Sequence, residues 1–415
     1  MKTDFEQLGN ADVLIVGGGP AGLSAALELR RLGVARVVVV ERDREAGGIP
    51  RHCAHLGFGL QDLRRSFTGP RYAQTLVSRV NAVGASILTE TSVRSVDAEG
   101  RVSLVSPQGI SQVTPRQVLL ATGARERPRA ARLIPGDRPS GIFTTGQLQQ
   151  WVHLKHFPVG KRALIVGAEH VSFSAMRTLR DAGVATVAAI TDLPRQQSLL
   201  GATMFSRLLF RAPVMTSTRL IEIRGRGRVQ VAIVENEVTG ETQKIAVDTV
   251  VFTGDWIPES ELAYRTGLEM SEDTMGPVVD TYGRTSRSQI FAAGNLVQPA
   301  ETAGVAALRG RRAAHEMANE SQTVDAIATK LKLSGDSSFR WVVPQRVSPS
   351  RPPDTVFFRT RTFSKNRVVV VHQGKRELGS YPLRHSTPNR GLSIGGECMK
   401  LADPQGEEIM LSLEN

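Results

Sequence analysis

The sequence predicts an α/β fold with two similar strand–turn–helix–strand units, followed by a small β domain. Three observations support this prediction. Residues 13–41 combine an apolar run, a glycine-rich turn, a run of helix-forming residues and a second apolar strand. The same order returns at residues 162–192, and from about Ser334 the chain changes to short alternating apolar runs. A repeated unit of this kind is a stronger signal than either copy alone.

The first unit carries the pattern Gly-x-Gly-x-x-Gly at residues 17–22, directly after the apolar strand. In this context the first glycine allows a tight turn, the second lets backbone approach a pyrophosphate, and the third lets the helix pack closely on the sheet. The helix N-terminus offers free N–H groups and a positive dipole end. A carboxylate after the second strand is placed to bind a ribose. We therefore expect a dinucleotide at Gly17, Gly19, Pro20, Ala21, Gly22, Glu41 and the adjacent Arg42.

Further glycine turns follow the first unit. Gly47, Gly48 and Ile49 come soon after the second strand, and a Gly-Gly turn lets a loop lie flat against a bulky planar ligand. Thr68-Gly69-Pro70 predicts the start of a helix. Alternation with turn signals predicts a small antiparallel meander over residues 92–117. It leads to a buried strand that ends in the turn Ala121, Thr122 and Gly123.

The second unit has an incomplete glycine pattern. Gly167 keeps the turn after the strand 162–166, but Glu169 and Ser172 take the places of the second and third glycines. A glutamate there adds bulk and negative charge at the anion-binding end of the helix. Asp192, after the next strand, is a candidate ligand for a nicotinamide ribose. The sequence thus predicts a degenerate NAD(P)-type site at Gly167, Glu169 and Asp192, in which the carboxylate of Glu169 opposes the binding of a pyrophosphate.

These elements predict two Rossmann-like, three-layer dinucleotide-binding domains, with the second inserted in the first. The first domain is discontinuous, and strands ending at Gly254 and Gly294 and a helix starting at 300–304 complete it. A further helix is expected over 197–210. The predicted boundaries are 10–155 and 253–325 for the first domain, 156–252 for the second, 335–353 for a Ser-, Pro- and Arg-rich linker, and 354–415 for a small β-rich C-terminal domain.

The composition excludes several classes of protein. The chain of 415 residues has a net charge of +12, but aromatic residues are only 5% and no basic run is interleaved with them, so we expect no nucleic-acid partner. Its two cysteines, Cys53 and Cys398, cannot form a disulfide framework, a four-cysteine zinc site or a cysteine-ligated iron–sulfur cluster, and we expect no metal. No signal segment or membrane-length apolar run is evident, which predicts a cytoplasmic protein.

Together the landmarks resemble the two-dinucleotide-binding-domain flavoproteins, which share the fold of thioredoxin reductase. The residues that carry this resemblance are 17–22, Glu41, 47–48, 121–123, 253–255 and 290–295. Residues 121–128 and 142–146 are similar to the FAD/NAD-domain subunits of dye-linked amine and amino-acid dehydrogenases, a group with sarcosine oxidase α, opine oxidase and hydroxyproline dehydrogenase. Residues 47–59 and 68–70 also look like flavoproteins that accompany glycerol-3-phosphate dehydrogenases.

The resemblance implies FAD, with its adenosine ribose on Glu41, its pyrophosphate on residues 17–22 and its isoalloxazine near Gly48 and Ile49. The turn at Gly294 and Asn295 would close over the ribityl chain, and the helix start at Thr302 and Ala303 would face the pyrimidine end of the flavin. The chain departs from the family in three ways. It lacks a Cys-x-x-Cys motif, it has Asn295 in place of an aspartate, and its second nucleotide motif is degenerate.

The candidates for chemical roles have plain structural alternatives. Cys53 could be a flavin-proximal thiol activated by neighbouring imidazoles, or a buried small hydrophobe. His52 and His55 could donate protons at the flavin face, or one could pack and the other lie at the surface. Arg125 and Arg127 could neutralise an anion, or be solvated arginines of a basic protein.

The best interpretation is a FAD-dependent oxidoreductase that transfers hydride or electrons through its flavin, as one part of a multi-subunit amine, amino-acid or related dehydrogenase. A stand-alone NAD(P)H-dependent flavin reductase or oxidase is one alternative. A FAD-stabilised assembly subunit without catalytic activity is the other. The expected partners are a small-molecule substrate or a dehydrogenase subunit, in a hetero- or homo-oligomer.

Overall fold

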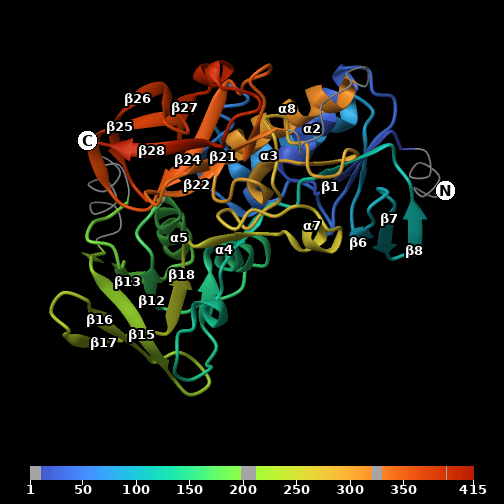
Figure 1. Ribbon diagram of the computed structural model, residues 1–415. Coiled ribbons are helices and arrows are strands. Elements are labelled where there is room, and N and C mark those ends of the chain that lie inside the picture. Colours follow the sequence, from blue (N-terminus) through green and yellow to red (C-terminus); the bar gives the residue numbers. More distant parts are fainter. Residues whose placement is uncertain (1–10, 198–211, 320–329, 389) are drawn as a thin grey trace. The chain divides into compact units, whose positions relative to one another are not determined.

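The computed structural model describes residues 11–197, 212–319, 330–388 and 390–415 (Figure 1). The chain divides into two compact units. Unit 1 comprises residues 1–51, 56–124 and 258–415, and unit 2 comprises residues 52–55 and 125–257. The second unit is thus inserted in the first, and the division falls at 124 and 258, where the sequence suggested 155 and 252. The helix expected over 197–210 lies outside the described residues, except for Gln197.

Unit 1 contains a five-stranded parallel sheet in the order β20-β9-β1-β2-β5. Its central strand β1 pairs with β2 on one side and β9 on the other, so that Val16 lies between Val40 and Leu120. This reversal of strand order beside β1 is the place where open α/β sheets bind nucleotides. The strands are β1 (Val13–Val16), β2 (Val37–Val40), β5 (Ser86–Leu88), β9 (Gln117–Leu120) and β20 (Ile290–Ala292).

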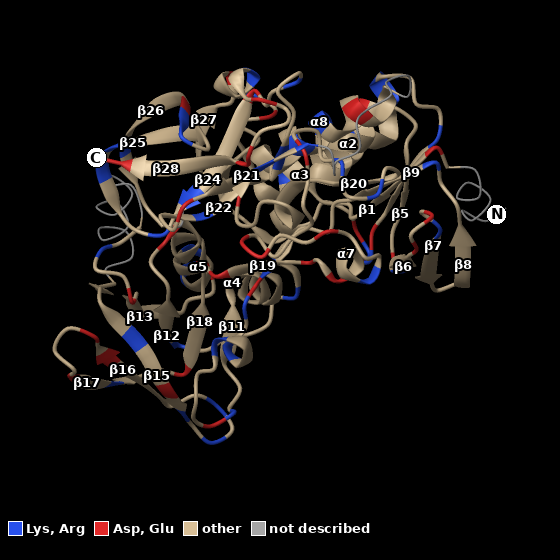
Figure 2. Ribbon diagram, in the orientation of Figure 1, with Lys and Arg blue, Asp and Glu red and all other residues tan. Residues whose placement is uncertain are grey.

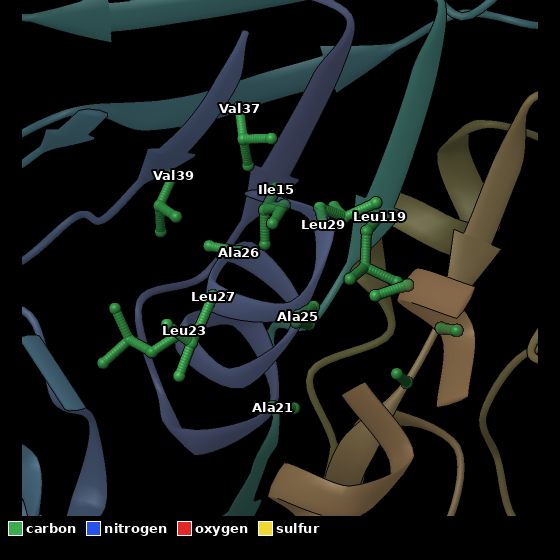
Figure 3. Packing of buried hydrophobic residues seen from close by; sticks show 14 of the residues in the cluster. Ile15, Ala21, Leu23, Ala25, Ala26, Leu27, Leu29, Val37, Val39 and Leu119 are labelled. Atoms are coloured by element: carbon green, nitrogen blue, oxygen red, sulfur yellow. The ribbon is translucent and has the colours of Figure 1, made fainter. Parts of the chain in front are cut away.

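Three helices accompany this sheet: α2 (Pro20–Arg31), α3 (Gly69–Ala82) and α8 (Ala303–Ala318). One face of α2 packs on the strands: Leu23, Leu27 and Leu29 lie in the same buried cluster as Ile15, Val39 and Leu119 (Figure 3). Small residues let α2 and α8 approach closely, since a Cβ on Gly310 would lie 2.0 Å from the carbonyl oxygen of Ala21. The helix predicted from Thr68 is confirmed as α3, with Pro70 in its first turn.

Smaller elements complete the dinucleotide-binding part of unit 1. The predicted meander is confirmed as the three-stranded antiparallel sheet β6-β7-β8. A short hairpin precedes α3, and a short helix follows the return of the chain to unit 1. Their bounds are β3 (Leu56–Phe58), β4 (Phe67–Thr68), β6 (Ser92–Val96), β7 (Val102–Ser106), β8 (Gly109–Val113) and α7 (Glu261–Arg265).

Unit 2, like unit 1, contains a five-stranded parallel sheet, in the order β11-β18-β12-β13-β14. It also contains the antiparallel sheet β15-β16-β17. Helices α4 (Thr145–Gln149) and α5 (His170–Asp181) belong to it. The pair β10 (Ala124–Glu126) and β19 (Trp256–Pro258) forms where the chain crosses between units. The other strands are β11 (Ile142–Thr144), β12 (Arg162–Val166), β13 (Ala185–Ile190), β14 (Val214–Met215), β15 (Thr218–Arg224), β16 (Val231–Asn236), β17 (Thr242–Ala246) and β18 (Thr249–Phe252).

The C-terminal part of unit 1 is β-rich and begins before residue 354. It has a five-stranded sheet, β23-β21-β28-β25-β26, and a three-stranded sheet, β22-β24-β27. The predicted linker 335–353 contains β22 and β23, because Trp341 and Val343 are buried in a core shared with strands β1 and β9. The strands are β21 (Leu331–Gly335), β22 (Phe339–Val343), β23 (Arg346–Val347), β24 (Thr355–Thr360), β25 (Ser364–Gln373), β26 (Arg376–Ser386), β27 (Leu392–Gly395) and β28 (Ile409–Glu414).

Basic and acidic residues are interspersed along the elements of each unit (Figure 2). The excess of arginine is therefore partly offset locally by ion pairs, such as Arg219 with Glu235 and Arg265 with Glu261. Among the described residues, no helix is both long enough and apolar enough to cross a membrane.

Candidate functional site

The glycine turn after β1 has the backbone that the motif requires. Gly17 has a positive φ of 110°, and its N–H donates to the carbonyl oxygen of Val40 at 2.9 Å. A Cβ on Gly22 would lie 2.0 Å from the carbonyl oxygen of Gly17, so only glycine lets α2 approach the turn this closely. These two glycines serve the fold itself.

Gly19 serves a different purpose, because the space beside it is open. A Cβ at this position would meet nothing nearer than the Cα of Gly48, at 4.0 Å. Gly19 is also the N-cap of α2, and no side chain caps this helix or places a carboxylate in its first turn. The N–H groups at the start of α2 are therefore left for a ligand, and the positive end of the helix dipole favours an anion there.

Glu41 lies directly beside this turn. Its side chain is buried, with one carboxylate oxygen accepting from the N–H of Gly18 at 2.9 Å and the other from the N–H of Asp43 at 2.9 Å. Each oxygen retains a lone pair for a ribose hydroxyl. Arg42 is exposed and reaches Glu259 at 4.0 Å, at the limit of an ion pair. The turn and Glu41 thus fit the adenosine and pyrophosphate of a dinucleotide.

The other predicted cofactor residues of unit 1 lie on three further loops. Gly48 has a positive φ of 62°, and a Cβ there would come within 3.0 Å of the Cα of Gly19. This close approach of two backbones brings the predicted pyrophosphate turn and the predicted isoalloxazine loop together. Ile49 follows and is 41% exposed, which leaves an apolar side chain available for a planar ring.

The turn at Ala121, Thr122 and Gly123 is fixed by Glu259. The Thr122 hydroxyl donates to the carbonyl oxygen of Glu259 at 2.8 Å, and the Glu259 N–H donates to the carbonyl oxygen of Gly123 at 2.9 Å. Glu259 was not a sequence candidate, because these bonds use its backbone and leave no signal in residue type.

The loop after β20 positions the start of α8. Asn295 uses its amide within the loop: its Nδ2 donates to the carbonyl oxygen of Glu301 at 3.1 Å, and its Oδ1 accepts from the Glu301 N–H at 3.2 Å. The side chain therefore braces the loop, and the expected position of this turn over the ribityl chain stays a prediction. Gly294 has φ of 74°, Thr302 caps α8 through the N–H of Val305, and Ala303 is its first residue.

Gln61, which has no recognisable sequence motif, contacts the start of α8. The Thr302 hydroxyl donates to its Oε1, and a Cβ on Gly304 would lie 2.7 Å from the same oxygen. A polar side chain thus covers the start of α8, where the reactive end of the flavin is expected.

The corresponding turn in unit 2 is closed by the residues that replace the glycines. The Glu169 N–H donates to Ser172 Oγ at 3.2 Å, and Ser172 Oγ lies 2.8 Å from Thr253 Oγ1. The Glu169 carboxylate lies over the two glycine turns at the strand ends. A Cβ on Gly167 would be 2.8 Å from its Oε2, and one on Gly254 would be 3.2 Å from its Cδ. The Glu169 carboxylate thus lies at the start of α5, where the sequence predicts that it opposes a pyrophosphate.

Burial dominates the electrostatics around this turn. It raises the pKa of Glu169, while hydroxyl groups of Thr253 and Ser172 and the charge of Arg132 act in the opposite direction. Asp192, the predicted ribose ligand, is exposed after β13, and its carboxylate lies 3.4 Å from Thr191 Oγ1.

The Arg127 side chain pairs with Asp255 at 3.4 Å, and Arg125 is exposed.

The His-Cys-Ala-His segment belongs to unit 2. Cys53 Sγ donates to Gln149 Oε1 at 3.2 Å, and His52 Nδ1 lies 3.2 Å from the same oxygen. Gln149 in turn donates to Ser174 Oγ at 2.7 Å. His52 and Cys53 are buried, whereas His55 is partly exposed. The thiol and His52 therefore share one amide oxygen, which the sequence analysis did not anticipate.

Cys53→Ser is expected to leave the flavin spectrum and turnover nearly unchanged. Burial and the charge of Glu126 raise the pKa of Cys53 to about 12, so the reactive thiolate is not populated at neutral pH. A serine hydroxyl can still donate to Gln149. Absorbance and steady-state rates of the two proteins test this. A loss of more than about a hundredfold, or about 2.7 kcal/mol, in a folded variant would give the thiol a chemical role.

Glu126 is a further buried carboxylic acid, and it was not among the residues predicted from the sequence. Strand β10 alternates, with Ala124 and Glu126 inward and Arg125 outward, so the strand period could have revealed it. One Glu126 oxygen accepts from the Gly146 N–H at 2.8 Å, while the other is buried and has no hydrogen-bond partner among the residues that the structure describes. Burial, more than the charge of Glu169, raises the pKa of Glu126 from 4.5 to about 7.

Glu126→Gln is expected to stabilise unit 2 above pH 7 and to have little effect at pH 5. The raised pKa means that the folded state prefers the neutral acid. Its contribution is fully present below the unfolded-state pKa of 4.5 and is lost as the pH rises through about 7. The difference amounts to at most about 3 kcal/mol. Thermal melts from pH 5 to 8 measure it, with exposed Glu241→Gln as the control. Equal pH profiles for Glu126→Gln and wild type would contradict the assignment.

Comparisons with known proteins agree with this arrangement. The family model described as pyridine nucleotide-disulphide oxidoreductase matches residues 11–317. An opine oxidase subunit of Rhizobium meliloti is 28% identical over 319 residues, which cover 68% of this chain and 58% of the relative. The HcnB subunit of hydrogen cyanide synthase from Pseudomonas protegens is 25% identical over 421 residues, 89% of this chain and 87% of the relative. The alpha subunit of sarcosine oxidase from a Corynebacterium is 27% identical, over 60% of this chain and 26% of the relative.

Solved structures show the same fold. Thioredoxin reductase of T. acidophilum superposes with a TM-score of 0.64 at 23% identity, covering 75% of this chain and 99% of that structure. L-proline dehydrogenase of P. horikoshii gives a TM-score of 0.59 at 20% identity, covering 76% of this chain and 56% of that structure. The predicted fold class and the resemblance to thioredoxin reductase and amine dehydrogenase subunits are confirmed.

Proposed function

This chain belongs to the pyridine nucleotide-disulphide oxidoreductase family, and from that premise we propose its function. It is an FAD-dependent oxidoreductase without a redox disulfide, since the sequence has no Cys-x-x-Cys pair and its two cysteines, Cys53 and Cys398, form no disulfide. We infer that it acts as one subunit of a larger amine or amino-acid dehydrogenase and passes electrons between a substrate and a partner.

The observation that supports this proposal best is the contrast between the two turns. The start of α2 is uncapped, with room at Gly19 and a carboxylate at Glu41 aligned by two backbone N–H groups. The start of α5 is occupied by Glu169. This contrast supports a dinucleotide at the first turn and disfavours one at the second, so the flavin is expected to take its electrons from a source other than NAD(P)H.

The residues that would hold FAD follow from unit 1. Glu41 would bind the adenosine ribose, the α2 N-terminus the pyrophosphate, and Gly48 and Ile49 would lie along the isoalloxazine. When bound, FAD supplies hydride or electron transfer at its isoalloxazine. The start of α8 at Thr302 would place positive dipole near the pyrimidine ring, where reduction builds negative charge.

The relatives support a role within a larger enzyme. The proteins matched from opine oxidase, sarcosine oxidase and hydrogen cyanide synthase are all named as subunits. This chain spans 58% and 61% of the length of the two first opine oxidase proteins that it matches. The substrate class and the partner are therefore part of the proposal.

The test is reduction of the flavin in the absence of oxygen. The chain is purified with and without the polypeptides encoded by neighbouring genes, and its absorbance is followed after addition of proline, sarcosine, an opine, NADH or NADPH. We expect an amine or amino acid to bleach the flavin only when a partner is present. Rapid bleaching of the isolated chain by NADH or NADPH would favour a stand-alone reductase. A partner complex whose flavin none of these donors reduces would favour an assembly role without catalysis.

A further inference from the structure

We propose that Arg359 is a positioning residue for the flavin site, through which the C-terminal β domain holds the loop that leads into α8. The proposal rests on the proposed location of FAD beside α8 and gives the C-terminal domain a role in it. Arg359 lies on β24, and its side chain is 6% exposed. All the groups involved belong to unit 1.

Arg359 binds the loop at Ala300 and Glu301, the last two residues before Thr302, which is the N-cap of α8. Its Nη2 donates to the carbonyl oxygen of Ala300 at 2.6 Å and to Glu301 Oε1 at 3.3 Å. The guanidinium also lies over the ring of Trp341 at 5.3 Å, which fixes its plane. A buried arginine that satisfies one backbone carbonyl and one carboxylate constrains both more strongly than a solvated ion pair does.

Ala300, whose carbonyl oxygen Arg359 binds, has a backbone conformation that needs support. Ala300 has a positive φ of 65°, in the left-handed region that residues with a Cβ rarely adopt. Such a conformation persists where the surroundings over-determine it. Here the bond from Arg359 to Ala300 and the two bonds between Asn295 and Glu301 fix the loop from both sides.

Two other contacts of the C-terminal domain reach the same region. A Cβ on Gly391 would lie 2.1 Å from Glu301 Oε1, so the backbone before β27 packs directly on that carboxylate. From α8, Arg309 donates to Gln298 Oε1 at 2.9 Å and lies over the ring of Phe357, in β24, at 4.2 Å. The loop is therefore enclosed between α8 and the C-terminal domain.

A separate set of ion pairs keeps α8 and this domain together further along the helix. Glu316, which is buried, accepts from Arg284 at 2.9 Å and from Arg351 at 2.8 Å. Arg312 pairs with Asp354. Because these bonds act near the C-terminal end of α8, loss of Arg359 alone should free the loop without detaching the domain.

The expected consequence is at the flavin. If the loop relaxes, the N-terminus of α8 moves from the place where its dipole stabilises reduced flavin. Arg359→Met should therefore raise the FAD dissociation constant at least about tenfold and lower the midpoint potential of the flavin. Arg361→Met, the same change two residues away on an exposed side chain, is the matched control.

Rescue distinguishes positioning from general damage. Glycine adopts positive φ readily. The double variant Arg359→Met/Ala300→Gly should therefore bind FAD at least about threefold more tightly than Arg359→Met alone. If Arg359→Met does not fold, Arg359→Lys, which keeps the charge but not the planar guanidinium, takes its place. Equal affinity and potential in the Arg359 and Arg361 variants, or no recovery with Ala300→Gly, would overturn the proposal.

Amide hydrogen exchange of residues 295–302 in the FAD-free chain separates this proposal from the proposed function. Faster exchange in Arg359→Met than in Arg361→Met supports the role of Arg359 in holding the loop, even if wild type binds no FAD and the proposed function fails. If wild type binds FAD but exchange and affinity are unchanged in Arg359→Met, the function stands and the role of Arg359 is wrong.

Discussion

Gly19→Asp is expected to abolish FAD binding and to leave unit 1 folded. The structure has room for a side chain at Gly19, where a Cβ would meet only the Cα of Gly48 at 4.0 Å. The cost therefore falls on the ligand: the aspartate would bring a negative charge to the place where the pyrophosphate is expected. A carboxylate about 4 Å from a phosphate charge costs about 4 kcal/mol at an effective dielectric constant near 20, or about three decades of affinity, before any clash is counted.

The measurement is FAD content after purification, followed by titration with added FAD. Gly19→Ala is the control for size without charge: it measures the steric part of the loss, and Gly19→Asp should lose more affinity than Gly19→Ala. Gly22→Ala is the opposite control, because its Cβ would lie 2.0 Å from the carbonyl oxygen of Gly17 and should destabilise the fold itself. Yellow, FAD-loaded Gly19→Asp protein would show that the flavin lies elsewhere.

Glu169→Gly is expected to improve the binding of nicotinamide nucleotides to unit 2. In the wild type, NADH and NADPH are expected to reduce the flavin slowly or negligibly. The substitution removes the carboxylate that lies over Gly167 and Gly254 and restores the glycine of the motif. For an ionised Glu169 the penalty relieved is about 1 to 4 kcal/mol, or roughly one to three decades of affinity, and the raised pKa of this buried acid lowers the electrostatic part of it. Ser172 remains in place of the third glycine, so the improvement should fall short of an intact site.

Anaerobic stopped-flow with millimolar NADH or NADPH measures the rate of flavin reduction in each variant. Glu169→Gln separates the contribution of the charge from that of the side-chain volume. Glutamine removes the charge but keeps the bulk, so a gain only in Glu169→Gly would assign the block to volume, and an equal gain in both would assign it to charge. Rapid, saturable bleaching of wild-type flavin would show instead that the second site works despite Glu169.

The elements that could be predicted from sequence are those encoded locally. The strand before Gly17, the helix after it and Glu41 lie within one short stretch, and both the period of the apolar residues and the glycine spacing point to the same unit. The repeat in unit 2 and the loss of two glycines could be recognised in the same way. The cofactor residues assigned on this basis remain predictions until ligand binding is measured.

The features that could not be predicted depend on contacts between distant residues. Arg359 meets Ala300 across 59 positions, and nothing in the residues around either one indicates the pair. Trp341 and Val343 lie in a stretch that reads as a linker because of its serines, prolines and arginines, yet they complete the core beneath the sheet of unit 1. The shared amide of Gln149 likewise connects Cys53 to a helix nearly 100 residues away.

The self-occupied turn of unit 2 also separates the two halves of the chain thermodynamically. The N-terminus of α5 is capped within the chain by the capping box of Glu169 and Ser172, whereas the N-terminus of α2 has no side-chain cap and leaves part of its stabilisation to the cofactor. By mass action, a ligand at one hundred times its dissociation constant adds about 2.7 kcal/mol to the state that binds it. FAD supply is therefore expected to affect the heat resistance of unit 1 more strongly than that of unit 2.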